Sequence, residues 1–373
     1  MALTLLISLL LAPLRALASD HADPTDLTDP SANITDLFFF PKDDQYILIF
    51  NVRRALTAPQ PYDLTPYEYR VNFDLTTPVK FDSAEDRARY GGTIAAPDKL
   101  HADATITVHL NNDATLKSIA INGLKGPDRV KTYTGVRDDP FNFPRFYKVN
   151  VIAMVMSLPK DAFPAGQHDF ILWGTASKDG TEIDHVGRSI RTQLPRFGII
   201  NTSPPAKQLT ILMDAKESRD NLYNFFKGKK EWYSKAIADL IQPIFQLRKY
   251  DLMPDVMVYS DRFPVGYPNG RLLTDDVVAQ TCAFGDCLLQ ELSYIEGGWP
   301  RATTNDKPFL DSWPYLAEPW PKRPEPAAPT QSLIPYILGI VLVVAFVSWA
   351  VIELLRRLIV WLWFKARARP KPV

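Results

Sequence analysis

Short apolar segments recur along the first half of the chain, and most of them alternate with polar residues or are rich in β-branched side chains. Turn-forming residues separate them at short intervals. A period of two is typical of strands with one buried face, and the close spacing favours antiparallel pairing. The predicted strands are residues 45–52, 67–73, 104–110, 116–121, 129–136, 148–158 and 169–177. We therefore expect a mainly β fold, either an antiparallel β-sandwich or a barrel-like outer domain.

The pattern changes between residues 216 and 247. Apolar residues are spaced there by three and four positions, which is typical of amphipathic helices. The spacing predicts two helices that break near Gly228. We expect a helical insertion over about 216–247 in a β-rich domain that covers residues 19–312.

The first 18 residues resemble a secretion signal. The apolar run from Ala2 to Leu14 is too short to span a bilayer, and Ala16-Leu17-Ala18 fits an A-x-A cleavage site. The alternatives are an uncleaved anchor or a buried N-terminal helix. A signal peptide over residues 1–18 would place the following domain outside the cytoplasm.

The C-terminal end predicts a single transmembrane helix over residues 333–352. The stretch 334–352 contains nineteen residues without a charge. Six cations and one anion follow in residues 353–373, and this excess places the C-terminus in the cytoplasm. We expect a protein of the bacterial inner membrane that spans it once, with its large N-terminal domain in the periplasm.

Two further segments flank the predicted span. Residues 313–332 contain six prolines, which favour an extended and fairly stiff linker. Residues 353–373 interleave leucines and tryptophans with cations, as in an amphipathic helix at the lipid headgroups. That tail either carries arginines that reach the interface from a tilted span or docks on another membrane subunit.

The net charge of the whole chain is zero, but the charge is distributed unevenly. The tail carries a net charge of +5 and the predicted signal carries Arg15, so the rest of the chain has a net charge of −6. An acidic outer domain argues against nucleic acid as a partner. Integral membrane protein subunits and lipid are the partners that the topology predicts.

The two cysteines, Cys282 and Cys287, lie four residues apart in "TCAFGDC". No histidine lies beside them, so the spacing is a poor metal signature and favours a disulfide in an oxidising compartment. No C-x-x-C-H sequence is present, which excludes a covalently attached haem.

Four stretches together resemble one protein family. They are "DHADPTDLTDPSANITDLFFFP" (20–41), "GVRDDPFNF" (135–143), "LPRFGIINT" (194–202) and "LMPDVMVYSDRFPVGYPNGRLLTDDVV" (252–278). Their order and style are similar to the bacterial domain-of-unknown-function family 4331. The resemblance implies an exported protein with a β-rich domain, to which this chain adds a C-terminal anchor. It implies no activity.

Acidic residues in the first two of these four stretches could form a metal site. Carboxylate oxygens with one imidazole suit calcium or a transition metal. The alternative is a set of caps and turns in the first segment and an ion-pair clamp in "RDDPFNF". The candidate metal ligands are His21, Asp23, Asp138 and Asp139.

The stretch "PNGRLLTDDVV" (268–278) reads as a turn followed by a short helix. Gly270 can adopt the positive φ that such a turn requires. Thr274 is the expected N-cap, with Asp275 and Asp276 in the first helical turn. We expect Arg271 to pair with one of these two carboxylates as a structural clamp.

These observations favour a non-catalytic accessory or scaffold subunit that stabilises a larger integral membrane complex, for example a respiratory or photosynthetic one. The sequence carries no G-x-S-x-G, H-E-x-x-H, P-loop or dinucleotide-binding motif. Two other hypotheses are a metal-dependent enzyme or metal-binding sensor and an extracytoplasmic ligand-binding domain.

Overall fold

The structure is a computed structural model, which describes residues 30–54, 61–192, 194, 196–297, 300–321, 342 and 344–357. The chain divides into two compact units, which are described separately. One unit, Ala16–Arg323, contains the β-rich domain, and the other comprises Met1–Arg15 and Pro324–Val373.

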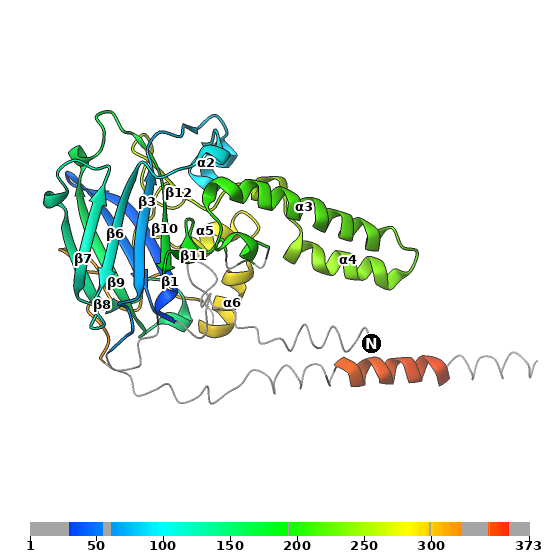
Figure 1. Cartoon of the computed structure of the whole chain (residues 1–373). Helices are drawn as coiled ribbons and strands as arrows, with labels where there is room; N and C mark the ends of the chain where they lie inside the picture. The colour runs from blue at the N-terminus through cyan, green and yellow to red at the C-terminus, as the bar shows by residue number, and fades with distance from the viewer. Residues whose placement is uncertain are drawn as a thin grey trace, which may run out of the picture. The chain divides into compact units, whose positions relative to one another are not determined.

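Most strands of the domain belong to two antiparallel sheets, which confirms the predicted mainly antiparallel β fold and is consistent with a sandwich, one of its two predicted forms (Figure 1). Sheet A has the order β1 (Ile34–Lys42), β2 (Gln45–Val52), β9 (Asn150–Pro159) and β8 (Lys131–Asp138). Sheet B has the order β11 (Thr181–Val186), β10 (Asp169–Lys178), β3 (Tyr67–Asp74), β6 (Ala104–Leu110) and β7 (Leu116–Asn122), with β12 (Met257–Ser260) also paired to β10. A short pair consists of β4 (Val79–Lys80) and β5 (Thr93–Ile94).

A cluster of aromatic rings fills the space between the two sheets. The ring of Phe170 lies 5.0 Å from that of Tyr46 and 5.1 Å from that of Phe163, measured between centroids. Phe39 contributes a further ring from β1, 5.6 Å from Phe170. Burial of each such side chain stabilises the fold by about 1.5–3 kcal/mol, so this cluster is a major source of the stability of the sandwich.

Strand β1 was not predicted, and its burial explains why. Its residues from Ile34 to Phe40 are all buried, so the sequence shows no polar alternation. Phe39 faces the inter-sheet core, whereas Phe38 and Phe40 face a second cluster outside sheet A that includes Leu316. A strand covered on both faces cannot be recognised from a period of two.

The helices lie outside the two sheets. The α-helices are α2 (Ala84–Tyr90), α3 (Pro205–Lys227), α4 (Trp232–Phe245), α5 (Val277–Cys282) and α6 (Leu288–Gly297). The 3-10 helices are η1 (Pro30–Ala32), η2 (Pro97–Lys99), η3 (Pro127–Arg129), η4 (Pro144–Phe146), η5 (Lys160–Ala162), η6 (Gly198–Ile200) and η7 (Lys249–Asp251).

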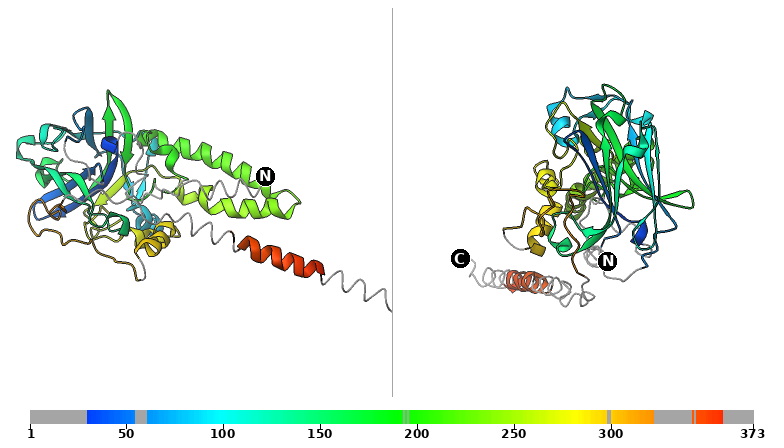
Figure 2. Two further views of the ribbon diagram at one scale, coloured as in Figure 1. Left: turned by 90° about the horizontal axis from the view of Figure 1, so that it is seen from below. Right: turned by 90° about the vertical axis from the view of Figure 1, so that its left-hand side faces the viewer.

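Helices α3 and α4 form the predicted helical insertion. Gly228 caps the C-terminus of α3, so the break occurs where it was predicted. Helix α3 begins at Pro205, earlier than expected, because a proline at the first helical position needs no hydrogen-bond acceptor for its nitrogen. The two helices form an antiparallel hairpin that projects from the sandwich (Figures 1 and 2).

The first part of the segment 313–332, which we predicted to be an extended and fairly stiff linker, packs on the domain. Leu316 and Ala317 are buried, and the Ala317 carbonyl accepts a hydrogen bond of 3.3 Å from the Asp138 amide. Asn150 and Trp320 exchange two hydrogen bonds, of 3.0 and 2.8 Å. Since β8 is the edge strand of sheet A, this segment covers an otherwise open edge. Residues 322–332 lie outside the described residues.

In the second unit, residues 344–357 are helical. Within the described residues, no helix is both long and apolar enough to cross a membrane. Half of the predicted span, residues 333–341 and 343, lies outside the described part, as do the predicted signal and residues 358–373 of the tail.

Candidate functional site

The predicted metal ligands are described only in part. His21 and Asp23 lie outside the described residues. Asp138 is the last residue of strand β8 and Asp139 follows it, and the two have different partners. Asp138 accepts a hydrogen bond of 2.6 Å from the Asn305 side-chain amide, and Asp139 pairs with Arg54. Among the residues that the structure describes, no three His, Cys, Asp or Glu side chains gather in a way that could hold a metal ion.

Burial favours the protonated form of both carboxyls. It raises the pKa of Asp138 to about 6, and the hydrogen bond from Asn305 opposes this shift. Burial also raises the pKa of Asp139, against the charge of Arg54. Asp138 therefore changes its protonation in a mildly acidic solution.

Asp139 belongs to a buried group of four charges, which we call the neutral cluster. It contains Arg54, Asp139, Asp36 and Arg271. Nη2 of Arg54 lies 3.6 Å from Oδ2 of Asp36, and Nη2 of Arg271 lies 3.8 Å from Oδ1 of Asp36. All four side chains are at least 95% buried. Among the residues that the structure describes, two guanidiniums face two carboxylates, which is the arrangement of a buried structural ion-pair cluster.

The predicted clamp between Arg271 and the carboxylate pair is wrong in its partners. Arg271 pairs with Asp36, and its guanidinium carbon lies 3.8 Å from the ring centroid of Phe38. Asp275 instead accepts hydrogen bonds of 2.8 Å from the backbone amides of Tyr267 and Leu272. These local amides satisfy the carboxylate, and Arg271 is held by a strand 235 residues away in sequence.

The short helix after this turn is α5, and its cap differs from the prediction by two residues. Asp276, rather than Thr274, is the N-cap and accepts a hydrogen bond of 3.1 Å from the Ala279 amide. Asp276 also pairs with Arg301. Gly270 has φ +70°, and a Cβ there would lie 2.6 Å from the Phe39 carbonyl oxygen, so the turn requires glycine.

The predicted disulfide between Cys282 and Cys287 is confirmed. It closes a loop that directly follows α5, and this loop carries Phe284 and Asp286 into the wall of a cavity. The bond therefore restrains two side chains of the pocket.

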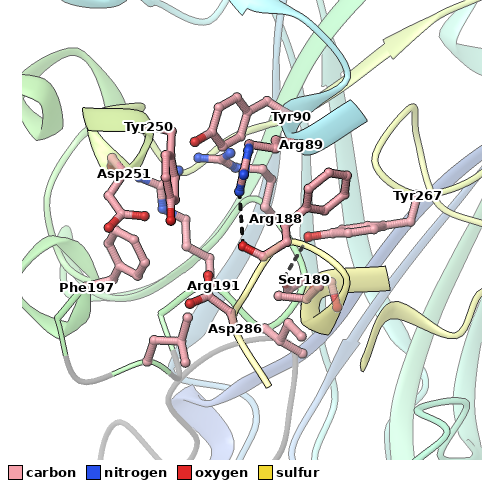
Figure 3. Close-up of a pocket in the computed structure, with 14 residues that line it drawn as sticks. Arg89, Tyr90, Arg188, Ser189, Arg191, Phe197, Tyr250, Asp251, Tyr267 and Asp286 are labelled. Atoms are coloured by element: carbon pink, nitrogen blue, oxygen red, sulfur yellow. Dashed lines mark hydrogen bonds between the residues drawn. The ribbon is translucent and has the colours of Figure 1, made fainter. Parts of the chain in front are cut away.

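This cavity, which we call the arginine pocket, has a volume of about 60 Å³. It lies between the end of α2, the loop after β11, η7, α5 and the disulfide loop (Figure 3). Its lining residues are Arg89, Tyr90, Arg188, Ser189, Ile190, Arg191, Leu194, Phe197, Tyr250, Asp251, Tyr267, Thr281, Phe284 and Asp286. Cations, aromatic rings and aliphatic groups thus meet in one small space.

Two carboxylates of the pocket are already paired with arginines. Arg196 lies 3.3 Å from Asp251 and 2.6 Å from Asp286, and Arg248 lies 3.0 and 2.8 Å from the same two carboxylates. Arg89 pairs at 3.0 Å with Glu85 on the preceding turn of α2.

Arg188 and Arg191 are different because they contact carbonyl oxygens instead of carboxylates. Arg188 donates through Nη2 to the Pro254 carbonyl at 2.9 Å, and Arg191 donates to the same oxygen at 3.2 Å. In the part of the chain that the structure describes, no carboxylate oxygen lies within ion-pairing distance of either guanidinium. Arg188 and Arg191 are only 5% and 7% exposed, so bulk water screens their charge weakly.

The loop after β11 holds Arg188 in place through Asp255. The buried Asp255 carboxylate accepts hydrogen bonds from the amides of Gly187 and Arg188, at 3.1 and 2.9 Å. A Cβ on Gly187 would lie 2.1 Å from the Asp255 carbonyl oxygen, so only glycine allows this close approach. The Arg188 side chain then lies over Tyr90, with its guanidinium carbon 4.5 Å from the ring centroid.

The end of the α3–α4 hairpin is the second candidate site. Apolar side chains that would normally be buried are exposed there, and we call them the hairpin tip. Its members and their exposed fractions are Leu222 (51%), Phe225 (58%), Trp232 (79%) and Tyr233 (52%). Three exposed lysines accompany them, namely Lys227, Lys229 and Lys230.

Comparisons with protein-family models, curated proteins and solved structures gave no match. The resemblance to family 4331 therefore stays a prediction, and function has to be argued from the geometry of this chain.

Sequence reasoning found neither the arginine pocket nor the hairpin tip. Arg188 and Arg191 lie three residues apart, but their carbonyl partners are about sixty residues further along the chain. The signal at the tip was the run "FFKGKKEWY" (225–233), which places aromatic residues beside lysines at a helix break. A helix break normally carries polar residues, so the aromatic residues there could have been recognised as a binding feature.

Proposed function

We propose that this protein is a non-catalytic, membrane-anchored accessory subunit whose extracytoplasmic sandwich docks, through the hairpin tip, on another subunit of an integral membrane complex. The observation that carries the proposal is the exposure of four large apolar side chains at the end of a projecting hairpin. The anchor, the periplasmic location and the partner are parts of the same proposal and rest on the sequence.

The composition of the tip supports a protein interface. Trp and Tyr are enriched among residues that dominate binding energy, since each buries a large ring at a small cost in side-chain entropy. Trp232 is 79% exposed, so docking could bury nearly its whole side chain. Several large apolar side chains exposed at one end of a hairpin are typical of a surface that meets a partner.

The positive charge around the tip favours a partner with acidic residues. Residues 222–235 contain four lysines and one glutamate, a net charge of +3. The apolar side chains would form the centre of the contact and the lysines its rim, so a complementary partner has an apolar centre and acidic edges.

The length of the hairpin explains how the tip reaches a neighbour. Helix α3 has 23 residues, which corresponds to about 35 Å at 1.5 Å per residue. Its base is fixed to the domain, because Leu212 packs with Leu194, Phe197, Ile200 and Leu247. The hairpin therefore presents the tip at a distance from the sandwich, as an arm that contacts a neighbouring subunit would.

A lipid surface is the alternative occupant of the tip, because tryptophan, tyrosine and lysine also suit membrane interfaces. The predicted span over residues 333–352 would already attach the chain to the bilayer, so lipid contact at the tip would add little. A protein contact gains more from such tethering, because the anchor raises the effective concentration of the domain near a membrane-embedded partner.

The test is native electrophoresis of mildly solubilised membranes that contain the full-length chain. We expect the wild type to migrate with a larger complex and the double variant Phe225→Ser/Trp232→Ser to migrate as the free chain. The matched control is Leu116→Ser/Leu288→Ser, which removes two exposed apolar side chains elsewhere and should leave the complex intact. A wild type that migrates only as a free chain, or a tip variant that stays in the complex, would overturn the proposal.

A second measurement identifies lipid contact. The purified full-length chain is reconstituted into phosphatidylcholine–phosphatidylglycerol vesicles with brominated acyl chains, which quench nearby tryptophans. Equal quenching of the wild type and Trp232→Phe is expected if the tip contacts protein. If the wild type shows a quenched fluorescence component that is missing from Trp232→Phe, Trp232 lies in lipid. That result would contradict protein docking.

A further inference from the structure

The arginine pocket has an excess of positive charge that the described chain does not neutralise. Of the three arginines that line it, Arg89 pairs with Glu85, whereas Arg188 and Arg191 pair with no carboxylate among the described residues. Its two lining carboxylates, Asp251 and Asp286, are already paired with Arg196 and Arg248. In the neutral cluster, by contrast, each of the two arginines lies within 4 Å of a carboxylate oxygen. The difference requires an explanation specific to the pocket.

The excess is located at Arg188 and Arg191. Nε of each of these two side chains is buried and has no hydrogen-bond partner among the described residues. Within the described part of the chain, the Arg188 side chain donates a hydrogen bond only through Nη2, to the Pro254 carbonyl. Buried guanidinium donors without acceptors are costly, so a ligand that accepts from them would gain both charge pairing and hydrogen bonds.

We propose that the arginine pocket binds the anion of a small monocarboxylic acid, with its carboxylate beside Arg188 and Arg191. Guanidinium groups recognise carboxylates with high affinity because their N–H donors and charge match the two acceptor oxygens. This site is independent of the hairpin tip and adds a ligand-binding role to the proposed accessory function.

The size and walls of the pocket select the ligand. A cavity of about 60 Å³ has room for only a few non-hydrogen atoms, since one water molecule needs about 10–15 Å³ of space measured in this way. Rings and aliphatic groups form much of the wall, among them Tyr90, Phe197, Phe284 and Leu194. Such walls suit the short alkyl group of acetate or propionate, whereas they would strip water from a phosphate dianion at a higher cost.

Tyr90 adds a hydrogen-bond donor on the wall. Burial raises the pKa of its hydroxyl, so the side chain stays protonated and uncharged at neutral pH. A neutral phenol beside Arg188 can donate to an anion and does not compete with it for the guanidinium.

The test measures the melting temperature of the full-length chain in detergent, at constant ionic strength, with acetate, propionate, phosphate or chloride as the probe. We expect saturating acetate or propionate to raise Tm by about 3 °C and phosphate and chloride to have no comparable effect. The rise should disappear in Arg188→Met. It should persist in Arg262→Met, a control that removes one cation from a half-exposed ion pair on the sandwich.

A second variant keeps the test decisive if Arg188→Met does not fold. Thr281→Leu retains every arginine and fills part of the cavity, so it should abolish the rise in Tm without changing the charge of the pocket. The proposal would be overturned by the absence of a carboxylate effect on the wild type, by an equal effect of chloride or phosphate, or by an undiminished effect in Thr281→Leu.

Discussion

The aromatic residues of the sandwich and those of the hairpin tip have opposite environments in one domain. Phe170 is fully buried and touches the rings of Tyr46 in sheet A and Tyr259 in sheet B, whereas Trp232 is 79% exposed. The first kind of side chain stabilises the fold, and the second contributes little until something covers it. Hydrophobicity alone therefore does not tell whether a side chain contributes to stability or to binding, because the same residue types support folding in one place and recognition in another.

The largest expected effect comes from emptying the sandwich core. Phe170→Ala should lower the free energy of unfolding by about 3–5 kcal/mol, because it removes a buried ring and leaves a cavity. Phe225→Ala, the matched change at the tip, should change it by less than about 0.5 kcal/mol. Urea unfolding of both variants checks the contrast, and comparable losses would show that the tip is part of the folded core.

The neutral cluster gives the next largest effect. Arg54→Met leaves Asp139 and Asp36 buried beside one remaining arginine, and we expect a loss of about 3 kcal/mol. Arg129→Met is the control, since the Arg129–Asp161 pair is exposed and such pairs are worth about 0–1 kcal/mol. Equal stability of the two variants in urea unfolding would contradict a buried, essential cluster.

A smaller effect depends on pH and reports on Asp138. Its folded pKa of about 6 exceeds the value of about 3.9 in an unfolded chain. Between these values the folded state binds more protons, so the contribution of Asp138 is fully present below pH 4 and is lost as the pH rises through 6. Relative to Asp138→Asn, the wild type should lose on the order of 1–2 kcal/mol between pH 4 and pH 7. Parallel stability curves would contradict the shifted pKa.

The fold could be predicted from the sequence wherever one face of a strand is exposed or a helix is amphipathic. Strand β6 spans residues 104–110 as predicted, and the helix break falls at Gly228. Strand β1 was missed because both of its faces are buried. Arg271 was given the wrong partner because sequence reasoning considers neighbours, whereas its guanidinium reaches Asp36 on another strand.

The candidate sites were less predictable than the fold because they depend on contacts between residues that are far apart in the sequence. The arginine pocket combines side chains from α2, the loop after β11, η7 and the disulfide loop, and only the tertiary structure brings them together. The hairpin tip was visible as a pattern, but its apolar residues looked like ordinary packing positions. Exposure can be read from the structure and not from the period of the sequence.

The smallest effect on stability should come from the tip itself. We expect Phe225→Ser/Trp232→Ser to unfold within about 0.5 kcal/mol of the wild type, because exposed side chains contribute little to the folded state. The same variant should nevertheless leave the membrane complex. A large loss of stability would mean that dissociation reflects unfolding rather than a lost contact.

The central claim, that the hairpin tip contacts another protein, is tested most directly by a photo-crosslinking amino acid at position 232 of the full-length chain in native membranes. We expect one light-dependent adduct with an integral membrane protein. The same membrane protein should comigrate with the wild-type chain on native gels. The same probe at position 116, on the sandwich, should give no such adduct. The absence of that adduct at position 232, or its equal formation at position 116, would contradict the claim.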